Sequence, residues 1–514
     1  MNEISTEQSS QPARESGPLG PDLALLSAIA VGRLLLHIVT NRQYGFHRDE
    51  LAVIDDARYL AWGYVAYPPV TPFIGRLSLV LFGPSLVGVR FFNALAQCVA
   101  MVLAALIARE LGGNRKAQVL TALATATAPI SLAAGALFQY VAFDYLWWVL
   151  IAYFVVRLLN SEDPRWWLGI GATIGVGMMT KYTIGFYVAG LVVGVVATRS
   201  RRYLSSRWLW IGVVLSILIF LPNLFWQIQH HFISAEFLRS IHQRDVAIGR
   251  SDNYLLDQIR LCINFFTIPL ALAGLYFYTV SPAGKRYRLL AFMFIVPLVL
   301  FLVARGRGYY MGPAYPMLLA AGGVVWERWT SSNSVRMRVA RWSIWAGILL
   351  GGLLSAAVAL PIAPVNSSWW KFSSELNGDL KEEIGWPELV ETIAGVYQSL
   401  SAEERNVTGI LTGNYGEAGA INLYGPAAGL PKAISGVNSY WLRGYGTPPP
   451  QTLIVVGLSR KTLDRNFGSC ELVAKVTNRY GVKNEESGDH PDVYMCRQLR
   501  ESWPEFWQHF RYYG

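Results

Sequence analysis

Two adjacent carboxylates, Asp49 and Glu50, follow the first membrane-length apolar segment of the chain. Ionisable groups beside hydrocarbon are costly and tend to mark a functional site. A carboxylate there can take the proton of an attacking hydroxyl group. We therefore predict Asp49 as a general base and Glu50 as a group that orients Asp49 or a donor substrate. His47 and Arg48 precede the pair and are candidate phosphate contacts, with lipid headgroup contacts as the alternative. Asp49 and Glu50 could also be simple solvated loop residues.

Three cationic side chains are candidates for holding a phosphate group. They are Lys181, Arg305 and Arg307, and Tyr309 and Tyr310 follow the second and third. All three cations lie at predicted outer ends of apolar segments, on the side that membrane proteins keep poor in Lys and Arg. Glycines alternate with the arginines, and glycine permits close approach of the backbone to an anion. Arginine forms fork-shaped contacts with phosphate. The alternative interpretation is contact with lipid headgroups.

Two further acids have more than one interpretation. Asp144 stands near the outer end of an apolar segment, either favoured by a helix dipole or acting as a third acid in a cavity. Glu417 follows a predicted strand and either caps a helix or faces an acceptor substrate. The chain contains no CxxC pair, HExxH or P-loop, so zinc-protease and nucleotide-hydrolysis hypotheses lack support. No metal ligand set and no certain cofactor is predicted, although acids and water could hold a divalent metal.

The composition is that of an integral membrane protein. Of the 514 residues, 53% are hydrophobic and only 15% are charged, with a mean hydropathy of +0.31. A soluble globular protein has about 25% charged residues. The net charge of +10 is better explained by basic cytoplasmic loops than by nucleic acid. The first 20 residues are polar and lack the apolar core of a cleavable signal peptide, so we expect a disordered cytoplasmic tail.

About eleven apolar segments are long enough to be predicted as membrane spans. They lie near residues 22–40, 87–108, 117–136, 141–159, 166–181, 183–199, 208–227, 260–279, 288–304, 311–326 and 343–363. Lys and Arg gather in five consecutive alternate loops, which marks those loops as cytoplasmic. The N-terminus is then cytoplasmic, and both the loop with Asp49 and the C-terminal part lie outside.

The first outer loop is predicted to hold two helices on the membrane surface. Leu51 to Tyr64 forms the first, the prolines of Tyr67-Pro68-Pro69 end it, and Thr71 to Phe82 forms the second. The outer loop over residues 228–259 mixes acids, arginines and histidines, which is typical of a solvated or lid-like segment.

The C-terminal part is predicted to be an α/β domain. Thr408 to Tyr424 is typical of strand, turn and helix, Gln451 to Gly457 of a buried strand, and Val493 to Arg497 of an edge strand. Cys470 and Cys496 both lie in this part, and a disulfide between them is compatible with an extracytoplasmic location.

Four segments in this order resemble the GT-C glycosyltransferases of the protein O-mannosyltransferase family, and above all their bacterial lipid A aminoarabinose transferase relatives. The segments are Phe46 to Leu51, Ala61 to Pro72, Met179 to Phe186 and Arg305 to Gly323, within a similarity over residues 25–325. The resemblance implies a polyprenyl-phosphate sugar donor, chemistry on the outer face, inversion, and Asp49 as the catalytic acid residue of the first outer loop. It also implies that Lys181 and the Arg305–Arg307 segment lie near the donor phosphate. Tyr67 replaces a polar or acidic residue of many relatives, which leaves the acceptor open.

The resulting hypothesis is a polytopic membrane all-α bundle of GT-C type with a C-terminal extracytoplasmic α/β domain. Its predicted parts are a tail over residues 1–20, a transmembrane glycosyltransferase domain over 21–363 with the first outer loop at 41–86, and the outer domain over 364–514. It would transfer a sugar from a polyprenyl-phosphate donor to a lipid, polysaccharide or protein of the cell envelope, in a bacterial inner membrane. A transporter or flippase of a lipid-linked saccharide is the main alternative. It would favour broken helices near the bilayer midplane, whereas the charges here gather on the outer surface. A polytopic scaffold that binds partners would leave the acidic pair unexplained.

Overall fold

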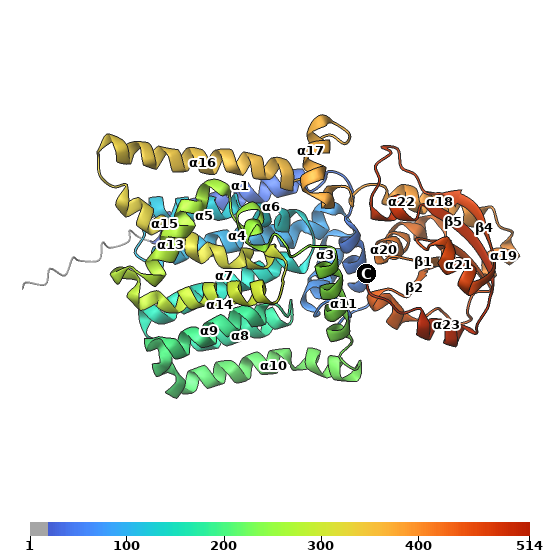
Figure 1. Ribbon diagram of the computed structural model, residues 1–514, viewed down its shortest axis with the longest axis horizontal. Helices are drawn as coiled ribbons and strands as arrows, with labels where there is room; N and C mark the ends of the chain where they lie inside the picture. Colours follow the sequence, from blue (N-terminus) through green and yellow to red (C-terminus); the bar gives the residue numbers. More distant parts are fainter. Residues whose placement is uncertain (1–18) are drawn as a thin grey trace, which may run out of the picture.

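A computed structural model describes residues 19–514. The tail predicted over residues 1–20 therefore lies, except for its last two residues, outside the described part of the chain. Most helices run alongside one another in a bundle, and a smaller domain with a β-sheet sits at one end of it (Figure 1).

The bundle is built from apolar helices joined by short turns. They are α1 (Leu19–Thr40), α4 (Leu86–Glu110), α5 (Arg115–Ala126), α6 (Pro129–Ala136), α7 (Tyr140–Ser161), α8 (Trp166–Met178), α9 (Ile184–Ala197), α10 (Arg207–Gln229), α13 (Ile268–Thr279), α14 (Arg288–Val303), α15 (Tyr315–Trp329) and α16 (Val335–Ala359). Short helical turns connect them: η1 (Arg199–Ser205), α12 (Tyr254–Asp257), η2 (Gln258–Cys262), η3 (Phe265–Thr267), η4 (Pro282–Tyr287) and η5 (Gly308–Ala314). In the core, the ring of Trp148 stacks on Tyr187 with centroids 4.2 Å apart.

Each predicted apolar segment contains a helix or a bent helix pair. Among the described residues, six helices are long and apolar enough to cross a membrane, or up to nine if each of three bent pairs is one span. Two shorter apolar helices, α3 (Val70–Phe82) and α8, add to these. The protein is thus a multi-pass membrane protein, as its composition predicts.

Several helices at the end of the bundle next to the C-terminal domain belong to the loops between spans. They are α2 (Arg48–Asp56), α3 and α11 (Ile233–Ala247), and α17 (Ser368–Leu376) follows the last bundle helix. In Figure 1, α11 and α17 run across the direction of the bundle helices. The helix predicted from Thr71 to Phe82 is confirmed as α3, whereas the loop predicted over residues 228–259 contains the regular helix α11.

The helix predicted from Leu51 to Tyr64 was placed wrongly. Helix α2 begins at Arg48, where the capping side chain of His47 accepts a hydrogen bond from the second helical residue, and it ends at Asp56. Its apolar residues and its two terminal acids are buried, because the C-terminal domain covers it. Burial by a domain 360 residues away in sequence is not visible in a local pattern of polar and apolar residues.

The C-terminal domain carries a five-stranded sheet of order β2-β1-β3-β5-β4. Its strands are β1 (Thr408–Thr412), β2 (Ala433–Ser435), β3 (Thr452–Val456), β4 (Phe467–Lys475) and β5 (Asp492–Leu499). Around it lie α18 (Trp386–Gln398), α19 (Ala402–Val407), α20 (Tyr415–Tyr424), α21 (Arg460–Asn466), α22 (Glu485–Asp489) and α23 (Trp503–His509), with the short turns η6 (Gly378–Leu380), η7 (Gly425–Ala428) and η8 (Asn438–Arg443).

The sheet confirms two of the sequence predictions and corrects a third. Strand β1 followed by α20, and strand β3, occur where they were predicted. Strand β5 is not an edge strand, because it pairs antiparallel with β3 on one side and β4 on the other. Cys470 and Cys496 face each other across β4 and β5 and form a disulfide, while Cys98 and Cys262 are free and buried.

Helices α2 and α20 pack side by side and run in the same direction. Gly416 lies against Arg48, Gly419 against Leu51, and Asn422 against Asp55. A Cβ atom on Gly419 would lie 2.6 Å from the carbonyl carbon of Leu51, so only glycine permits this approach. The C-terminal domain is thereby fixed along α2, whose first turn carries Asp49, the predicted general base.

Candidate active site

Asp49 occupies the first turn of α2, where the helix dipole favours negative charge. Its backbone N–H donates to Nδ1 of the capping residue His47 at 3.1 Å. Its carboxylate accepts two hydrogen bonds from neutral donors, Nε2 of Gln139 at 2.6 Å and the hydroxyl of Tyr415 at 2.7 Å. The side chain remains 36% exposed. The guanidinium of Arg48 forms an ion pair with the carboxylate, with Nε 3.9 Å from Oδ1. Asp49 is therefore oriented by neutral donors beside a cation, and a hydroxyl group can still reach its exposed part.

Glu50 is fully buried and its oxygens are occupied. They accept hydrogen bonds from Nε and Nη2 of Arg90 at 2.8 and 2.6 Å, from the backbone N–H of Phe138 at 2.7 Å, and from that of His47 at 2.9 Å. The last bond completes a capping box at the start of α2. Glu50 thus connects α2, α4 and the segment before α7, and it can hold Asp49 in place only through the backbone.

Arg90 is a buried residue that the sequence analysis missed. Besides Glu50, its guanidinium contacts the carbonyl oxygen of Gly45 at 2.9 Å and the carboxylate of Glu383 at 3.2 Å. Burial raises the pKa of Glu383 to about 7, against the opposing effect of Arg90. A signal was present, because Arg90 is an ionisable residue inside the span predicted over 87–108.

Lys181 lies in a cage of aromatic rings. Its ammonium group is 4.2 Å from the ring centroid of Tyr310, 5.0 Å from that of Tyr140 and 5.3 Å from that of Tyr309. The carboxylate of Asp144 is 3.9 Å away. Aromatic faces attract a cation without consuming its hydrogen-bond donors as a carboxylate does. Lys181 is thus held at the end of α8 and keeps donors for an anionic ligand.

Two consecutive residues at the start of α7 connect the acid to the caged cation. Gln139 donates to the carboxylate of Asp49, and the ring of Tyr140 faces Lys181. Tyr140 is also close enough to Asp49 and Arg307 for a coulombic interaction with each. The predicted base and the predicted phosphate ligands therefore border one region.

The remaining predicted cations differ from Lys181. Arg307 forms a forked ion pair with Asp245 of α11, with N–O distances of 2.6 and 3.0 Å. Arg305 is exposed and has a left-handed backbone with φ of 49°. Arg48 lies over the ring of Tyr415 at 5.7 Å. The structure thus brings Asp49 and Arg48 to the start of α20, and Asp49 and Lys181 to the start of α7.

A second acidic pair, Asp55 and Asp56, ends α2. Both carboxylates accept hydrogen bonds from Arg443 of the outer domain, and the Tyr67 hydroxyl donates to Asp56. Burial raises the pKa of Asp56 to about 6, while Arg443 acts in the opposite direction. Tyr67, which the resemblance marked as a departure, thus belongs to an interdomain cluster.

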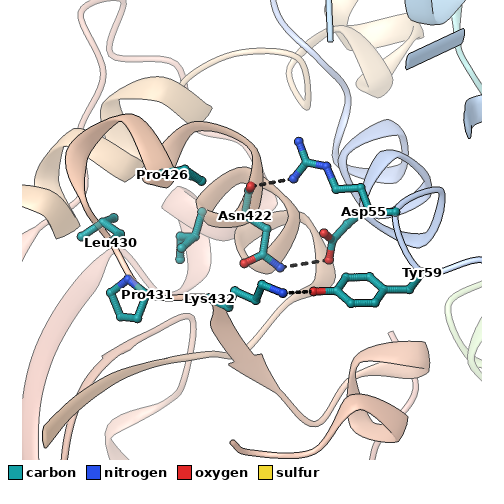
Figure 2. A pocket seen from close by; sticks show the side chains of 9 residues that line it. Asp55, Tyr59, Asn422, Pro426, Leu430, Pro431 and Lys432 are labelled. Carbon is teal, nitrogen blue, oxygen red and sulfur yellow. Dashed lines mark hydrogen bonds between the residues drawn. The ribbon is translucent and has the colours of Figure 1, made fainter. Parts of the chain in front are cut away.

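A small cavity of about 290 Å³ opens beside this cluster, between the end of α2 and α20. In Figure 2, Asn422 donates to Asp55, and the Lys432 amine donates to the hydroxyl of Tyr59. Pro426, Leu430 and Pro431 line its apolar side. The polar groups of this cavity already bond one another, so it is part of the contact between the domains.

The site residues that the sequence analysis missed differ in how strongly the sequence signals them. Gln139 and Tyr415 carry no signal in sequence, because a polar residue before a helix and a tyrosine after a strand are common. The capping interpretation of Glu417 is confirmed, since its carboxylate accepts from the backbone N–H groups of Gly413 and Asn414. Within residues 19–514, no group of three or more His, Cys, Asp or Glu side chains is placed to hold a metal ion.

Comparisons with known proteins agree with this architecture. A family model described as dolichyl-phosphate-mannose-protein mannosyltransferase matches residues 66–226. The crystal structure of ArnT from Cupriavidus metallidurans bound to undecaprenyl phosphate superposes with a TM-score of 0.54 at 17% identity, over 93% of this chain and 98% of that chain. The fold is therefore that of the GT-C membrane glycosyltransferases, and the resemblance found in the motifs is confirmed at this level.

Two curated bacterial enzymes are similar to parts of the chain. Lipid A galacturonosyltransferase RgtD of Rhizobium johnstonii is 23% identical over 206 residues, which is 38% of this chain and 41% of that protein. Undecaprenyl phosphate-alpha-4-amino-4-deoxy-L-arabinose arabinosyl transferase 1 of Pseudomonas fluorescens is 30% identical over 188 residues, which is 34% and 32% of the two chains. The chain therefore spans less than half of the length of these two relatives.

Proposed function

We propose that this protein is an integral membrane glycosyltransferase. It transfers a sugar from a polyprenyl-phosphate donor to a lipid, polysaccharide or protein of the cell envelope, with inversion at the sugar carbon. The observation that carries the proposal is the link through Gln139 and Tyr140 between an accessible carboxylate and a caged lysine. These two groups are what the reaction needs on opposite sides of the sugar.

The reaction divides between these two groups. Asp49 accepts the proton of the acceptor hydroxyl as its oxygen bonds to the sugar carbon. The bond from that carbon to the phosphate oxygen breaks, and polyprenyl phosphate leaves with its electron pair. Lys181 stabilises the negative charge that grows on the phosphate, together with the hydroxyl groups of Tyr309 and Tyr310. Arg48, Arg305 and Arg307 add positive potential around the donor.

An apolar groove offers room for the lipid tail of the donor. A cavity of about 430 Å³ lies on α10 and is lined by Trp62, Leu218, Leu221, Pro222, Phe225, Trp226 and Gln229. Tyr182, the neighbour of Lys181, donates to Asn223 of α10 at 2.9 Å. Asn223 in turn donates to the carbonyl oxygen of Trp62 at 2.8 Å. The groove thus adjoins the segment that carries the phosphate-binding lysine.

We further propose about eleven spans, with the N-terminus cytoplasmic and the active site and C-terminal domain outside the inner membrane of a bacterium. The alternating Lys and Arg loops support this orientation. The disulfide in the C-terminal domain supports an oxidising compartment.

The test is sugar transfer by purified protein in lipid bilayers. With a labelled undecaprenyl-phosphate sugar and envelope extract, we expect label on an acceptor and release of undecaprenyl phosphate. Lys181→Gln should raise the KM for the donor because the phosphate loses its cation, whereas Lys432→Gln in the interdomain cavity is the matched control. Movement of intact lipid-linked sugar across vesicles without transfer would instead establish a flippase.

A further inference from the structure

Helix α17 carries an exposed apolar edge at the outer end of the last bundle helix. Its residues divide into three sectors by helical spacing. Trp370, Ser373 and Ser374 are buried against the protein. Trp369, Phe372 and Leu376 are 41%, 60% and 63% exposed. The third sector is charged and consists of Lys371 and Glu375, both exposed.

Hydrogen bonds from three side chains fix α17 to the end of α16. The Trp369 indole and the Ser373 hydroxyl both donate to the carbonyl oxygen of Ala357, at 3.0 and 2.9 Å. Asn377 donates to that of Val358 at 3.2 Å. These carbonyl groups belong to the last turn of α16, where no further helical N–H is available to them. The depth of α17 is therefore set by the end of a membrane-length helix.

The exposed apolar edge continues a surface that faces hydrocarbon. Leu349, Leu350, Leu353 and Leu354 of α16 are exposed large apolar side chains on a candidate membrane span. A helix of 25 residues is about 37 Å long, so its end reaches beyond a hydrocarbon core of about 30 Å. In Figure 1, α17 runs across α16 at that end. A helix that lies there in the membrane plane has one edge toward the acyl chains and one toward water.

We propose that α17 is an interfacial anchor whose Phe372–Leu376 edge binds the outer leaflet of the membrane. The occupant is lipid at the boundary between headgroups and acyl chains, because α17 is bonded to the last turn of a membrane-length helix whose preceding turn carries the exposed Leu353 and Leu354. The charged sector then faces water and headgroups, as in amphipathic helices that lie on a membrane surface.

The anchor bears on the active site through the segment that follows it. Only six residues separate Leu376 from Glu383, which shares Arg90 with Glu50. Trp370, on the buried side of α17, packs in one cluster with Ile384 and Tyr44. The membrane surface thereby fixes one end of the segment that closes over the start of α2.

Site-directed spin labelling in lipid bilayers tests the proposal without reference to sugar transfer. The free cysteines Cys98 and Cys262 are buried and the other two are bonded, so a new surface cysteine is labelled selectively. Labels at Phe372→Cys and at Glu375→Cys are compared for collision with oxygen, which enters hydrocarbon, and with a water-soluble nickel chelate. Leu353→Cys on α16 provides the lipid-facing reference, and Leu376→Cys replaces Phe372→Cys if that variant does not fold.

We expect the label at position 372 to resemble that at 353, with a ratio of oxygen to nickel collisions several-fold above that at 375. Equal nickel accessibility at 372 and 375 would overturn the proposal. So would shielding of position 372 from both reagents, because that result means that a protein partner or a second copy covers the edge. An active enzyme with a water-exposed position 372 leaves the glycosyltransferase function standing and removes only the anchor.

Discussion

Each end of α2 carries a pair of adjacent acids, but the two pairs differ in their contacts and in their exposure. At the start, Glu50 binds the buried Arg90, whereas Asp49 has neutral hydrogen-bond donors, a longer ion pair with Arg48 at 3.9 Å and contact with solvent. At the end, Asp55 and Asp56 both bind Arg443 and are buried. The burial of each carboxylate and the closeness of its cation therefore decide whether the acid is available for chemistry, and adjacency alone does not.

The two pairs also serve different connections. Glu50 and Arg90 tie α2 to the bundle, whereas Asp55, Asp56 and Arg443 tie it to the outer domain. One helix of nine residues is thus held from both sides. Asp49 is positioned by both sets of contacts, since Gln139 belongs to the bundle and Tyr415 to the outer domain.

The comparison of the two acidic pairs predicts that Asp49→Asn has the largest effect on sugar transfer. Removal of the base should lower kcat for sugar transfer by about 10²- to 10⁴-fold, because an amide cannot accept the hydroxyl proton. The isosteric change at the other end, Asp55→Asn, is the control and should retain most activity. The measurement is the rate of sugar transfer from labelled donor, compared between variants that have equal thermal stability. Equal loss in both variants would mean that the two pairs do not differ in role.

The next effect concerns stability and compares the two arginines. Arg90→Met leaves the buried carboxylate of Glu50 without its cation, and removal of one partner of a buried pair costs about 3–5 kcal/mol. Arg443→Met should cost less, because its guanidinium is partly exposed and Asp56, whose pKa burial raises to about 6, can take up a proton. Chemical unfolding of the full chain in detergent gives both values.

The double variant Glu50→Gln/Arg90→Met supplies the control for that prediction. It removes both charges, so it should recover part of the free energy of unfolding lost in Arg90→Met. If the double variant is as unstable as the sum of the single variants, the ion pair does not account for the loss.

Sequence reasoning reached the architecture because membrane spans have a strong local signal. The apolar runs, the alternating basic loops and the strand-and-turn pattern after residue 408 all depend on neighbours in sequence. The order of motifs around Asp49 and Lys181 gave the fold. Strand β5 was assigned to an edge because pairing partners are not encoded in the strand itself.

The site was predicted only in part, for a physical reason. Asp49, Lys181 and Tyr310 carry charge or aromatic rings at conspicuous places. The partners of Asp49, Gln139 and Tyr415, and the Glu383 partner of Arg90 make contacts across tens to hundreds of residues. Arg307 was predicted as a phosphate ligand without its partner, because nothing in the polar segment over 228–259 marks Asp245 as that partner.

A smaller effect on catalysis tests the contribution of the outer domain to Asp49. Tyr415→Phe removes one hydrogen bond to the carboxylate, and bonds to charged groups contribute about 1.5–3 kcal/mol. We expect kcat to fall by about tenfold, because the carboxylate loses a donor that holds it in place. Tyr480→Phe, on the exposed surface of the same domain, is the control. A kcat equal to that of Tyr480→Phe would mean that this bond does not position the base.

The smallest predicted effect is on the pH dependence of stability, and it comes from a comparison of Glu50 with Glu417. Both glutamates occupy the third position of a helix and complete a capping box, one in α2 and one in α20. Glu50 meets Arg90, whereas burial raises the pKa of Glu417 to about 8 against two backbone N–H groups that lower it. Between the ordinary pKa of 4.5 and about 8, the folded protein keeps a proton that the unfolded chain has lost. The contribution of Glu417 to stability is therefore fully present at low pH and is lost as the pH rises toward 8.

Glu417→Gln should remove this pH dependence, because the amide is neutral throughout and its carbonyl oxygen can still accept from Gly413 and Asn414. One proton corresponds to about 1.4 kcal/mol per pH unit, so near neutral pH the wild-type melting temperature should fall with pH more steeply than that of the variant. Melting of the full chain between pH 5 and pH 8, with exposed Glu471→Gln as the control, measures the difference in slope. Parallel profiles for all three proteins would show that Glu417 is ionised in the folded state, so that a buried capping glutamate needs no arginine. The distinction between Glu50 and Glu417 would then have to come from the role of Arg90 in joining α2 to the bundle, and not from neutralisation of charge.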